Sequence, residues 1–232
     1  MIEDPPLLTI GARPEPLPAE ALAPFRDVPT GWLVDAMEGR GAMDCAIKPM
    51  APEMAGMRRF FGPALTCWCG PNDNLALLGA IAEVKPGEVI VVACEGFTGA
   101  GMCGDLTAGM ARNMGAVAIV TDGMVRDREG IVSVGLPVYC RGITPNSCVR
   151  SGPGTVGLPV VAGGVHIATG DLVVGDADGV VIVPRARLGE IASRLDAIRT
   201  AELAAEERVR GGQTIMGDIE ALLASNRVRR LG

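Results

Sequence analysis

A glycine-rich segment and an arginine–aspartate pair carry the residue types that could bind and transform a small anion. The segment GAGMCGDL, residues 99–106, contains Gly99-x-Gly101-x-x-Gly104, a spacing that also occurs in dinucleotide-binding loops. A dinucleotide loop starts directly at the end of a strand, whereas residues 94–98 separate this loop from the apolar run at 89–93. Glycines that lead into a helix instead leave its first N–H groups accessible, which suits a small carboxylate.

Asp105 follows these glycines, and Arg126-Asp127 lies at a defined distance from it. The twenty residues between Asp105 and Arg126 fit a helix, a turn and a strand. In a right-handed βαβ unit the two strands are parallel, so the loops after them emerge at the same sheet edge. The residues expected to converge there are Asp105, the backbone amides of Leu106 and Thr107, Arg126 and Asp127. The plainer alternatives are a helix N-cap for Asp105 and a surface ion pair or turn for Arg126-Asp127.

The elements that would position this site read as one α/β domain. Strands are expected at 60–69, 89–93 and 116–121, and helices at 18–25, 31–38, 72–84, 106–114, 185–210 and 214–224. Asn72 is expected to cap the helix that it begins. Residues 136–184 consist of short β-type runs between glycines and prolines, in which Asp171, Asp176 and Asp178 are expected to occupy hairpin turns.

The predicted organisation is a single domain over residues 1–232. It divides into an N-terminal arm and helix at 1–28, an α/β core at 29–184 and a C-terminal helical extension at 185–232. The arm itself, residues 1–17, is expected to be extended because prolines recur in it.

Composition excludes several classes of function. The net charge of -6 and the isoelectric point near 4.9 argue against a nucleic-acid partner, which needs a concentrated basic surface. Apolar runs are too short for a membrane span, and the acidic, proline-rich N-terminus does not resemble a secretory signal. Seven cysteines without a C-x-x-C pair, and the single histidine His166, argue against a zinc site and for structural thiols. We therefore expect a cytoplasmic protein without membrane or nucleic-acid partners.

The combination of Asp105, twenty residues and Arg126-Asp127 is also a family signature, and other stretches agree with it in order. These are PTGWLVDAM (29–37), GPALTCWC (62–69), KPGEVIVVA (85–93) and GVHIATGDLVVGDADGVVIVP (164–184). Over roughly residues 29–210 the chain resembles the class II pyruvate aldolases that act on 4-hydroxy-4-methyl-2-oxoglutarate and 4-carboxy-4-hydroxy-2-oxoadipate. Non-catalytic relatives of these enzymes are the regulators of ribonuclease activity A. The resemblance implies an α/β fold of the swivelling β/β/α type, a layered sandwich, here with helical extensions at both termini.

The resemblance also implies a role for each residue of the convergent site. Asp127 would ligate Mg²⁺ directly, with Mn²⁺ and Co²⁺ as alternatives, and Asp105 would hold a metal-bound water and position the water that exchanges protons. Arg126, the loop at Gly104 and the amides of Leu106 and Thr107 would bind the pyruvyl part of a 2-oxo acid. The implied reaction is aldol cleavage that releases pyruvate through an enolate, with oxaloacetate decarboxylation as a side activity.

The lysine content agrees with the metal-dependent route. An enolate can be stabilised by a lysine Schiff base or by a divalent metal with a cationic side chain. The chain has only Lys48, which precedes a proline, and Lys85, which lies in a turn before a strand. Neither belongs to the convergent site, so metal is favoured.

A further carboxylate follows from helical periodicity. The apolar positions Leu188, Ile191, Leu195 and Ile198 lead in the same rhythm to Glu202. The plain interpretation is a rim residue whose charge reaches solvent, and Glu206 and Glu207 nearby are alternatives to Glu202. The resemblance implies instead that Glu202 approaches, through water, the metal of a neighbouring subunit in a homotrimer or homohexamer.

Two questions stay open at this stage. Residues that bind the distal carboxylate of the substrate could include Arg58, Arg59, Arg141 or Arg150, all near predicted strand ends or loops. The alternative function is a non-catalytic protein that binds and regulates a ribonuclease; the long helical extension from 185 favours the aldolase.

Overall fold

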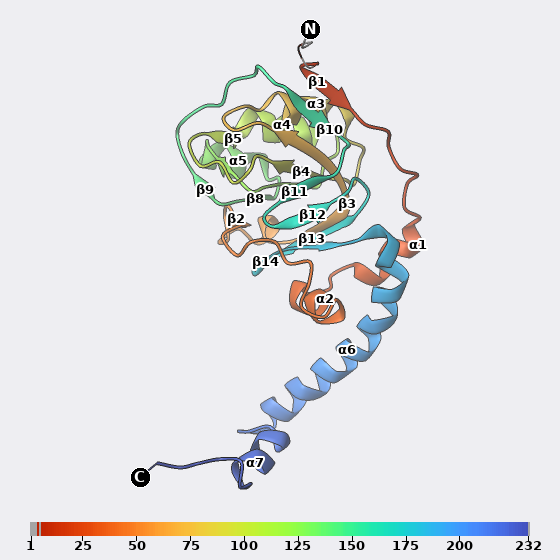
Figure 1. Cartoon of the computed structure of the whole chain (residues 1–232), viewed down its shortest axis with the longest axis vertical. Helices are drawn as coiled ribbons and strands as arrows, with labels where there is room; N and C mark the ends of the chain where they lie inside the picture. The colour runs from red at the N-terminus through yellow and green to blue at the C-terminus, as the bar shows by residue number, and fades with distance from the viewer. Residues whose placement is uncertain (1–3, 5, 232) are drawn as a thin grey trace.

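The computed structural model describes residue 4 and residues 6–231 (Figure 1). Its strands are β1 (Leu8–Ile10), β2 (Lys48–Pro49), β3 (Phe60–Cys69), β4 (Val89–Ala93), β5 (Gly101–Cys103), β6 (Ala118–Thr121), β7 (Met124–Val125), β8 (Val138–Cys140), β9 (Gly142–Ile143), β10 (Gly154–Val156), β11 (Val160–Ala162), β12 (Val165–Ile167), β13 (Leu172–Asp176) and β14 (Gly179–Val183). Its helices are α1 (Ala19–Leu22), α2 (Thr30–Ala36), α3 (Leu75–Glu83), α4 (Asp105–Asn113), α5 (Arg128–Val134), α6 (Leu188–Arg210) and α7 (Gly217–Leu223). The 3-10 turns are η1 (Ala23–Phe25), η2 (Ala55–Met57) and η3 (Arg185–Arg187).

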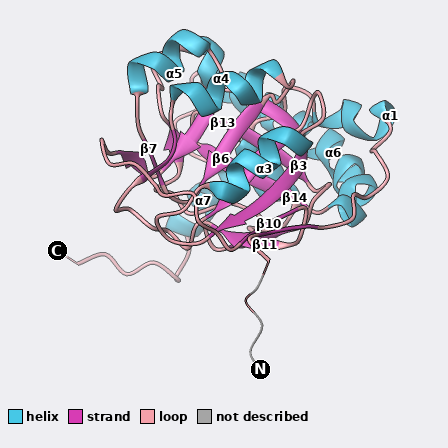
Figure 2. Cartoon of the chain, turned by 90° about the horizontal axis from the view of Figure 1, so that it is seen from above, coloured by secondary structure: helices cyan, strands magenta, loops and turns pink. Residues whose placement is uncertain are grey.

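The largest sheet has the strand order β1-β10-β3-β4-β6-β8-β2, and β13 joins it by pairing with β3 and β14. The central strands β3, β4, β6 and β8 are parallel, whereas β10 and β13 run antiparallel to β3. Helices α3, α4 and α5 cover one face, and β11 lies over the other (Figure 2). Strand β12 pairs with β11 in that second layer. The layered α/β fold predicted from the sequence is confirmed.

Strand β4 shows why the apolar runs form the centre of this sandwich. Its side chains alternate between the two faces, so that Ile90 and Val92 pack under the helices. Val89, Val91 and Ala93 pack against the opposite layer. All five residues are buried, and a continuous Val/Ile/Ala run is typical of a parallel strand covered on both faces.

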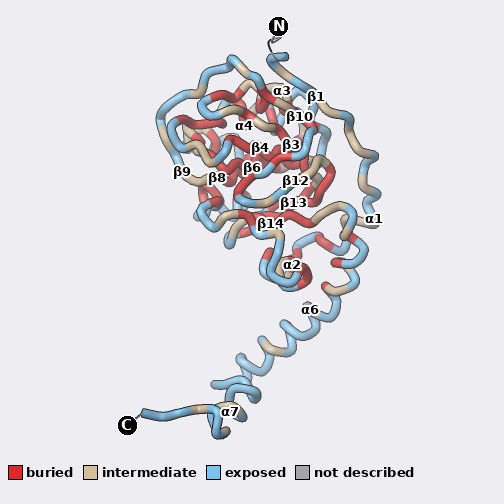
Figure 3. Tube along the Cα trace, viewed as in Figure 1, coloured by how far each residue is buried: buried red, intermediate tan, exposed pale blue. Residues whose placement is uncertain are grey.

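A separate apolar cluster fastens the start of the C-terminal extension to the body. Helix α2 and the first half of α6 pack on the β13–β14 hairpin through Leu33, Leu188, Ile191 and Leu195, among others. Beyond Ile198 the helix leaves the body and nearly all of its residues are exposed (Figure 3). Among the residues that the structure describes, no helix combines the length and apolarity needed to cross a membrane.

A small parallel sheet, ordered β5-β7-β9, lies beyond the carboxyl ends of the main strands. The sequence did not predict it, nor helix α5 directly after Asp127. The predicted arm differs as well, since β1 within it pairs in parallel with β10. Residues 1–3 and 5 of that arm lie outside the described residues. The extra strands matter because their carboxyl ends carry the predicted site residues.

One turn aspartate has a role in stability that its turn position does not suggest. Asp176 ends β13 in the expected hairpin, but its buried carboxylate accepts bonds from the Thr30 backbone N–H and hydroxyl, both at 2.8 Å, and from the Asp178 N–H at 2.9 Å. It therefore satisfies the N-terminus of α2 from a distant part of the chain.

Removing this carboxylate is expected to destabilise the fold. Asp176→Ala leaves buried donors without a partner, so the free energy of unfolding should fall by about 2–4 kcal/mol. Urea denaturation measures the change, and Asp178→Ala in the same turn is the control, expected to change the stability by less than about 1 kcal/mol because the residue is exposed. Equal effects of the two variants would contradict this role of Asp176.

Candidate active site

Three loops meet around one hollow at the carboxyl ends of β5, β7 and β9. The hollow has a volume of about 100 Å³, which suits a molecule of a few carbon atoms. The first loop supplies Gly104 and Asp105, the second supplies Arg126 and Asp127, and the third is the segment 144–150. The lining residues are Asn74, Gly101, Gly104, Asp105, Leu106, Thr107, Arg126, Asp127, Ser147, Cys148 and Arg150. The structure thus brings together all the residues of the predicted convergent site, whereas Glu202 does not line the hollow.

The first loop differs in detail from the expected helix cap. Gly104, not Asp105, is the N-cap of α4, and its N–H donates to the hydroxyl of Thr107 at 2.9 Å. Asp105 is the first helical residue, and its Oδ1 accepts the Leu106 N–H at 2.7 Å. A ligand that uses the Leu106 amide would have to compete with this contact. The Asp105 side chain also lies against α5, because a Cβ on Gly130 would be 2.5 Å from the Asp105 Cβ.

The second loop holds Arg126 in a fixed orientation. Its backbone N–H donates to the Cys103 carbonyl at 2.9 Å, which ties the end of β7 to the end of β5. The Arg126 Nε donates to Asp127 Oδ2 at 2.9 Å, and a terminal nitrogen donates to the Ser147 hydroxyl. Both charged side chains stay 37% exposed, so solvent and a ligand can reach them.

Asp127 has an unusual backbone that aims its carboxylate. It adopts a left-handed conformation, φ 55° and ψ 46°, and forms the N-cap of α5. Aspartate tolerates this region better than most residues. The preference explains how a sharp turn can separate β7 from α5 and leave the carboxylate beside Arg126.

Two glycines of the first loop are needed because neighbouring parts of the chain approach them closely. A Cβ on Gly101 would lie 3.0 Å from the Val125 carbonyl carbon, so glycine lets β5 and β7 pair closely. A Cβ on Gly104 would lie 2.5 Å from Asp127 Oδ2 and 3.3 Å from Arg126 Cγ. The GxGxxG spacing therefore has a packing origin that involves no dinucleotide.

Filling this space is expected to damage the site without unfolding the protein. Gly104 has an ordinary φ of -132°, so Gly104→Ala is not strained by its backbone but must displace Asp127 or Arg126. A displacement near 1 Å should lower the rate of the reaction proposed below about a hundredfold. Gly109→Ala in α4 is the control, since its Cβ would meet nothing closer than 3.7 Å. If the two variants had similar rates, the positions of the Asp127 and Arg126 side chains would not determine the rate of the reaction.

Asn74 is a site residue that the sequence did not single out. It is 92% buried (8% exposed), its Nδ2 donates to the Met102 carbonyl at 3.2 Å, and its Oδ1 is a buried atom with no partner among the described residues. An unpaired buried acceptor beside a hollow suits a ligand that donates a hydrogen bond. The expected cap at Asn72 is wrong, because α3 begins at Leu75 and Asn74 is its N-cap; the Leu75 N–H donates to Asp73 Oδ1 at 2.8 Å. No signal in the sequence separates Asn74 from its polar neighbours.

The cysteines near the hollow do not provide a nucleophile. Burial raises the pKa of Cys148 to about 11 and that of Cys103 to about 12. Both are therefore neutral thiols near pH 7, and a neutral thiol is a weak nucleophile.

The carboxylates of the hollow fit a hard divalent cation. Asp105 and Asp127 line it together, and within the part of the chain that the structure describes no group of three or more metal-ligand side chains occurs. Magnesium is commonly held by one or two carboxylates with several waters, so two aspartates at an accessible hollow are compatible with it.

Other candidate residues lie away from this hollow. Glu202 is exposed in the second half of α6, which extends away from the body (Figure 1), and it does not line the hollow. Arg59 donates to the Asp27 carbonyl at 2.9 Å, and Arg141 bonds Asp44 and the Asp122 carbonyl. Of the four arginines considered for the distal carboxylate, Arg150 is the one that lines the hollow.

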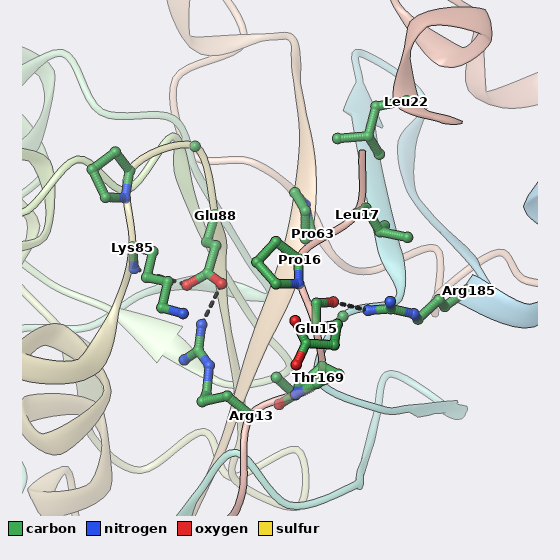
Figure 4. A pocket seen from close by; sticks show the side chains of 14 residues that line it. Arg13, Glu15, Pro16, Leu17, Leu22, Pro63, Lys85, Glu88, Thr169 and Arg185 are labelled. Atoms are coloured by element: carbon green, nitrogen blue, oxygen red, sulfur yellow. Dashed lines mark hydrogen bonds and ion pairs between the residues drawn. The ribbon is translucent and has the colours of Figure 1, made fainter. Parts of the chain in front are cut away.

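A larger hollow, of about 240 Å³, lies at the amino end of β4 beneath the N-terminal arm (Figure 4). Its charged groups fasten the arm: Arg13 forms an ion pair with Glu88, and Arg185 donates to the Glu15 carbonyl at 2.5 Å. The parallel pairing of β3 with β4 begins at Ala64 and Val89, so this hollow lies at the amino ends of the two strands. Asp105 lies at the opposite edge of the sheet, beyond the carboxyl ends of the strands. We assign the chemistry to the smaller hollow.

Known proteins resemble this chain in sequence. A sequence profile of the RraA-like family, described as Aldolase/RraA, matches residues 30–182. A protein of Halalkalibacterium halodurans, provisionally named 4-hydroxy-4-methyl-2-oxoglutarate aldolase, is 38% identical over 161 residues, which are 69% of this chain and 75% of that protein.

Solved structures resemble it over a larger share of the chain. An uncharacterised protein from Pseudomonas syringae pv. tomato aligns with a TM-score of 0.74 and 27% identity, covering 86% of this chain and 96% of that one. Streptomyces coelicolor RraAS2, described as an unusual member of the RNase ES inhibitor RraA family, aligns with a TM-score of 0.70 and 29% identity, covering 82% and 98%. Sequence profile, relative and fold agree, and the chain belongs to the RraA-like family of aldolases and RraA proteins.

Proposed function

We propose that the protein is a divalent-metal-dependent aldolase that releases pyruvate from a 4-hydroxy-2-oxo acid such as 4-hydroxy-4-methyl-2-oxoglutarate. The observation that carries the proposal is the convergence of Asp105, Arg126 and Asp127 on one accessible hollow of about 100 Å³. The 38% identity to a protein provisionally named as such an aldolase supports it.

Arg126 would bind the end of the substrate that becomes pyruvate. Its guanidinium is oriented by Asp127 and Ser147, and a planar donor matches the carboxylate and the neighbouring keto oxygen. The N-terminus of α4 adds backbone N–H groups and a favourable dipole for the same negative charge. The unpaired Asn74 Oδ1 could accept a hydrogen bond from a substrate hydroxyl.

The reaction breaks the C3–C4 bond of the substrate. Asp105 would position the water that takes the proton of the 4-hydroxyl group. The 4-oxygen then forms a carbonyl group with C4, which leaves as the second product, while the electrons of the C3–C4 bond move to C3 and give the enolate of pyruvate. The same water would return a proton to C3 to release pyruvate. A divalent cation near Asp127, Mg²⁺ or alternatively Mn²⁺ or Co²⁺, would supply Lewis-acid stabilisation of the enolate charge.

The positions of the two lysines argue against a Schiff-base route. Lys48 donates to the Asp178 carbonyl, and Lys85 lines the hollow beneath the arm. Neither lines the hollow that holds Arg126. Decarboxylation of oxaloacetate is the expected side activity, because loss of its carboxyl group gives the same enolate.

We further propose that the active form is a homotrimer or homohexamer. In it Glu202 of one subunit would approach the cation of its neighbour through water. The apolar residues that α6 and α7 leave exposed, including Leu203, Val209 and Met216, would then be covered by another copy.

A coupled lactate dehydrogenase assay tests the proposed function. With Mg²⁺ present, the protein should release pyruvate from 4-hydroxy-4-methyl-2-oxoglutarate or a similar acid, and from oxaloacetate more slowly. EDTA should remove the activity and added Mg²⁺ should restore it. Pyruvate release at the background rate from every such acid would contradict the proposal.

A regulator of ribonuclease activity is the second candidate, and the observation that favours it is the likeness to RraAS2. Such a protein would need no metal and no hollow with paired aspartates. Binding of an RNA-degrading enzyme, together with no release of pyruvate, would favour it over the aldolase.

A further inference from the structure

The larger hollow, beneath the N-terminal arm, is a space that the proposed reaction does not use. We call it the arm hollow; its wall includes Pro16 and Leu17 of the arm, Pro63 of β3, Lys85 of the turn before β4, and Arg185 at the start of η3 (Figure 4). Its volume of about 240 Å³ corresponds to about eight molecules of liquid water. The arm hollow therefore has room for a small organic molecule.

Much of this wall is apolar. The arm contributes Pro14, Pro16 and Leu17, and α1 contributes Leu22. Leu17 and Leu22 also pack against the apolar cluster that fastens α2 and α6 to the body, so they are held in place. Water beside apolar side chains is poorly bound, and an apolar ligand gains affinity by displacing it. The wall therefore suits a ligand with an apolar body.

The charged side chains of the wall leave an excess of positive charge. Arg13, Lys85 and Arg185 are basic, whereas Glu15 and Glu88 are acidic. Arg13 pairs with Glu88, and both side chains are largely buried, so these two charges compensate each other. The other three residues form no ion pair within the described part of the chain. Two cations then face one carboxylate, which favours an anionic ligand.

Packing around Gly170 places the Arg185 guanidinium in the arm hollow. Gly170 belongs to the wall, and a Cβ on it would lie 3.3 Å from Arg185 Nη1 and 2.9 Å from Pro14 Cγ. The same nitrogen donates to the Glu15 carbonyl, and the Arg185 backbone N–H donates to Asp171 Oδ1 at 2.8 Å. Because a guanidinium has five N–H donors, Arg185 keeps donors for the carboxylate of a ligand.

The arm hollow is open to solvent between the arm and the turn before β4. Glu15 and Pro16 of the arm are exposed, and so are Lys85, Pro86 and Gly87 of the turn. A small molecule can therefore enter without unfolding the arm, which β1 and the Arg13–Glu88 pair hold to the body.

We propose that the arm hollow binds a small monoanion with an apolar body, such as an aromatic carboxylic acid, and that Arg185 binds its carboxylate. The apolar body would lie against Pro16, Leu17 and Leu22. This site lies at the amino end of β4, and none of its wall residues lines the hollow of Arg126. The proposal is therefore independent of the proposed reaction.

Three probes separate the apolar from the charged contribution. Phenylacetate has both a ring and a carboxylate, 2-phenylethanol keeps the ring, and acetate keeps the carboxylate. Titration calorimetry with the full chain should give phenylacetate a dissociation constant of about 0.1–1 mM, reasonable for a ligand of about ten non-hydrogen atoms. Each of the other two probes should bind at least about tenfold more weakly.

Replacing Arg185 tests the charged contact. Arg185→Gln should weaken phenylacetate binding about tenfold, while its side-chain amide can still donate to the Glu15 carbonyl. The affinity for 2-phenylethanol should change less than about twofold, since that probe has no charge. Arg185→Lys should keep part of the phenylacetate affinity, because it retains the charge without the planar fork.

Two further variants define the comparison. Leu17→Ala removes part of the apolar wall and should weaken phenylacetate and 2-phenylethanol together, about three- to tenfold. Arg126→Gln is the matched control, since it removes an arginine from the other hollow and should leave phenylacetate binding unchanged.

A crystal structure with 4-bromophenylacetate locates the ligand directly. The anomalous signal of bromine should lie in the arm hollow, with the carboxylate at Arg185. The proposal is overturned if phenylacetate binds more weakly than about 10 mM, or if 2-phenylethanol binds equally well. It is also overturned if Arg126→Gln removes the binding while Arg185→Gln does not, because the acid would then occupy the hollow of the candidate active site.

Discussion

Replacing Asp127 with asparagine is expected to lower the rate of pyruvate release about a thousandfold or more, because the proposed cation loses its one direct carboxylate ligand. Asparagine keeps the shape of the side chain and tolerates the left-handed backbone at this position. Asp127→Ala should be equally inactive but less stable, since alanine adopts that backbone at a cost of about 1–2 kcal/mol.

The fold should survive this change. The Asp127 side chain is 37% exposed and pairs with Arg126, and it belongs to none of the three apolar clusters. Thermal denaturation of Asp127→Asn should therefore resemble that of the wild-type protein. Adding Mg²⁺ to high concentration should recover little activity, because the lost contact is a ligand and not a distant charge.

Asp44 offers a matched control for this experiment. It pairs with Arg141 at 2.7 Å and its side chain is also 37% exposed, but it lies outside the hollow of the candidate site. Asp44→Asn should leave the turnover rate within about twofold of the wild-type value. If Asp127→Asn and Asp44→Asn had the same small effect, Asp127 would be a partner in a surface ion pair and no metal ligand.

The strands that could be predicted from the sequence are those with long runs of apolar residues between turn residues. Strands β3 and β4 occupy the residues expected from their apolar runs, because a ten-residue and a five-residue run between turn signals leave little choice. The small sheet has strands of two or three residues, which carry too few side chains to show a period. Its pairing depends on glycine packing at Gly101, a tertiary contact that the sequence does not reveal.

The sequence predicted the site residues whose positions follow from the strand topology. It did not predict the features that depend on single side-chain or backbone contacts. Asp105, Arg126 and Asp127 meet because parallel connections return each loop to the same sheet edge. The cap position was wrong by one residue, since Gly104 is the N-cap of α4 and bonds Thr107, while Asp105 is the first residue of the helix. Asn74 became visible through an unpaired buried oxygen, which depends on atoms from distant segments.

A mixture of two inactive variants is expected to regain activity if Glu202 acts in a neighbouring subunit. The first half of α6 is fixed to the body by Leu188, Ile191 and Leu195, and Glu202 lies about 10 Å further along the helix axis than Leu195. This part of the helix extends away from the body of its own chain (Figure 1), so we expect the carboxylate to serve the site of another chain.

In a cyclic trimer each site would combine Asp127 of one subunit with Glu202 of the next. Asp127→Asn and Glu202→Gln should each be nearly inactive as pure proteins. After subunit exchange of an equal mixture, about a quarter of the sites should hold both native carboxylates, because each of the two positions is native with a chance of about one half. The mixture should therefore reach about a quarter of the wild-type rate, measured by pyruvate release.

A mixture of Asp127→Asn with Arg126→Gln is the control that separates complementation from simple reactivation. Both residues line the hollow of the same chain, so a mixed trimer contains no site with both side chains native, and its rate should stay near background. Exchange is confirmed by mass spectrometry of differently tagged subunits. If subunits exchange and the Asp127→Asn with Glu202→Gln mixture stays inactive, Glu202 has no role in a neighbouring site. The exposed apolar residues of α6 and α7 would then serve an interface alone, and each chain would hold its cation with two aspartates and water.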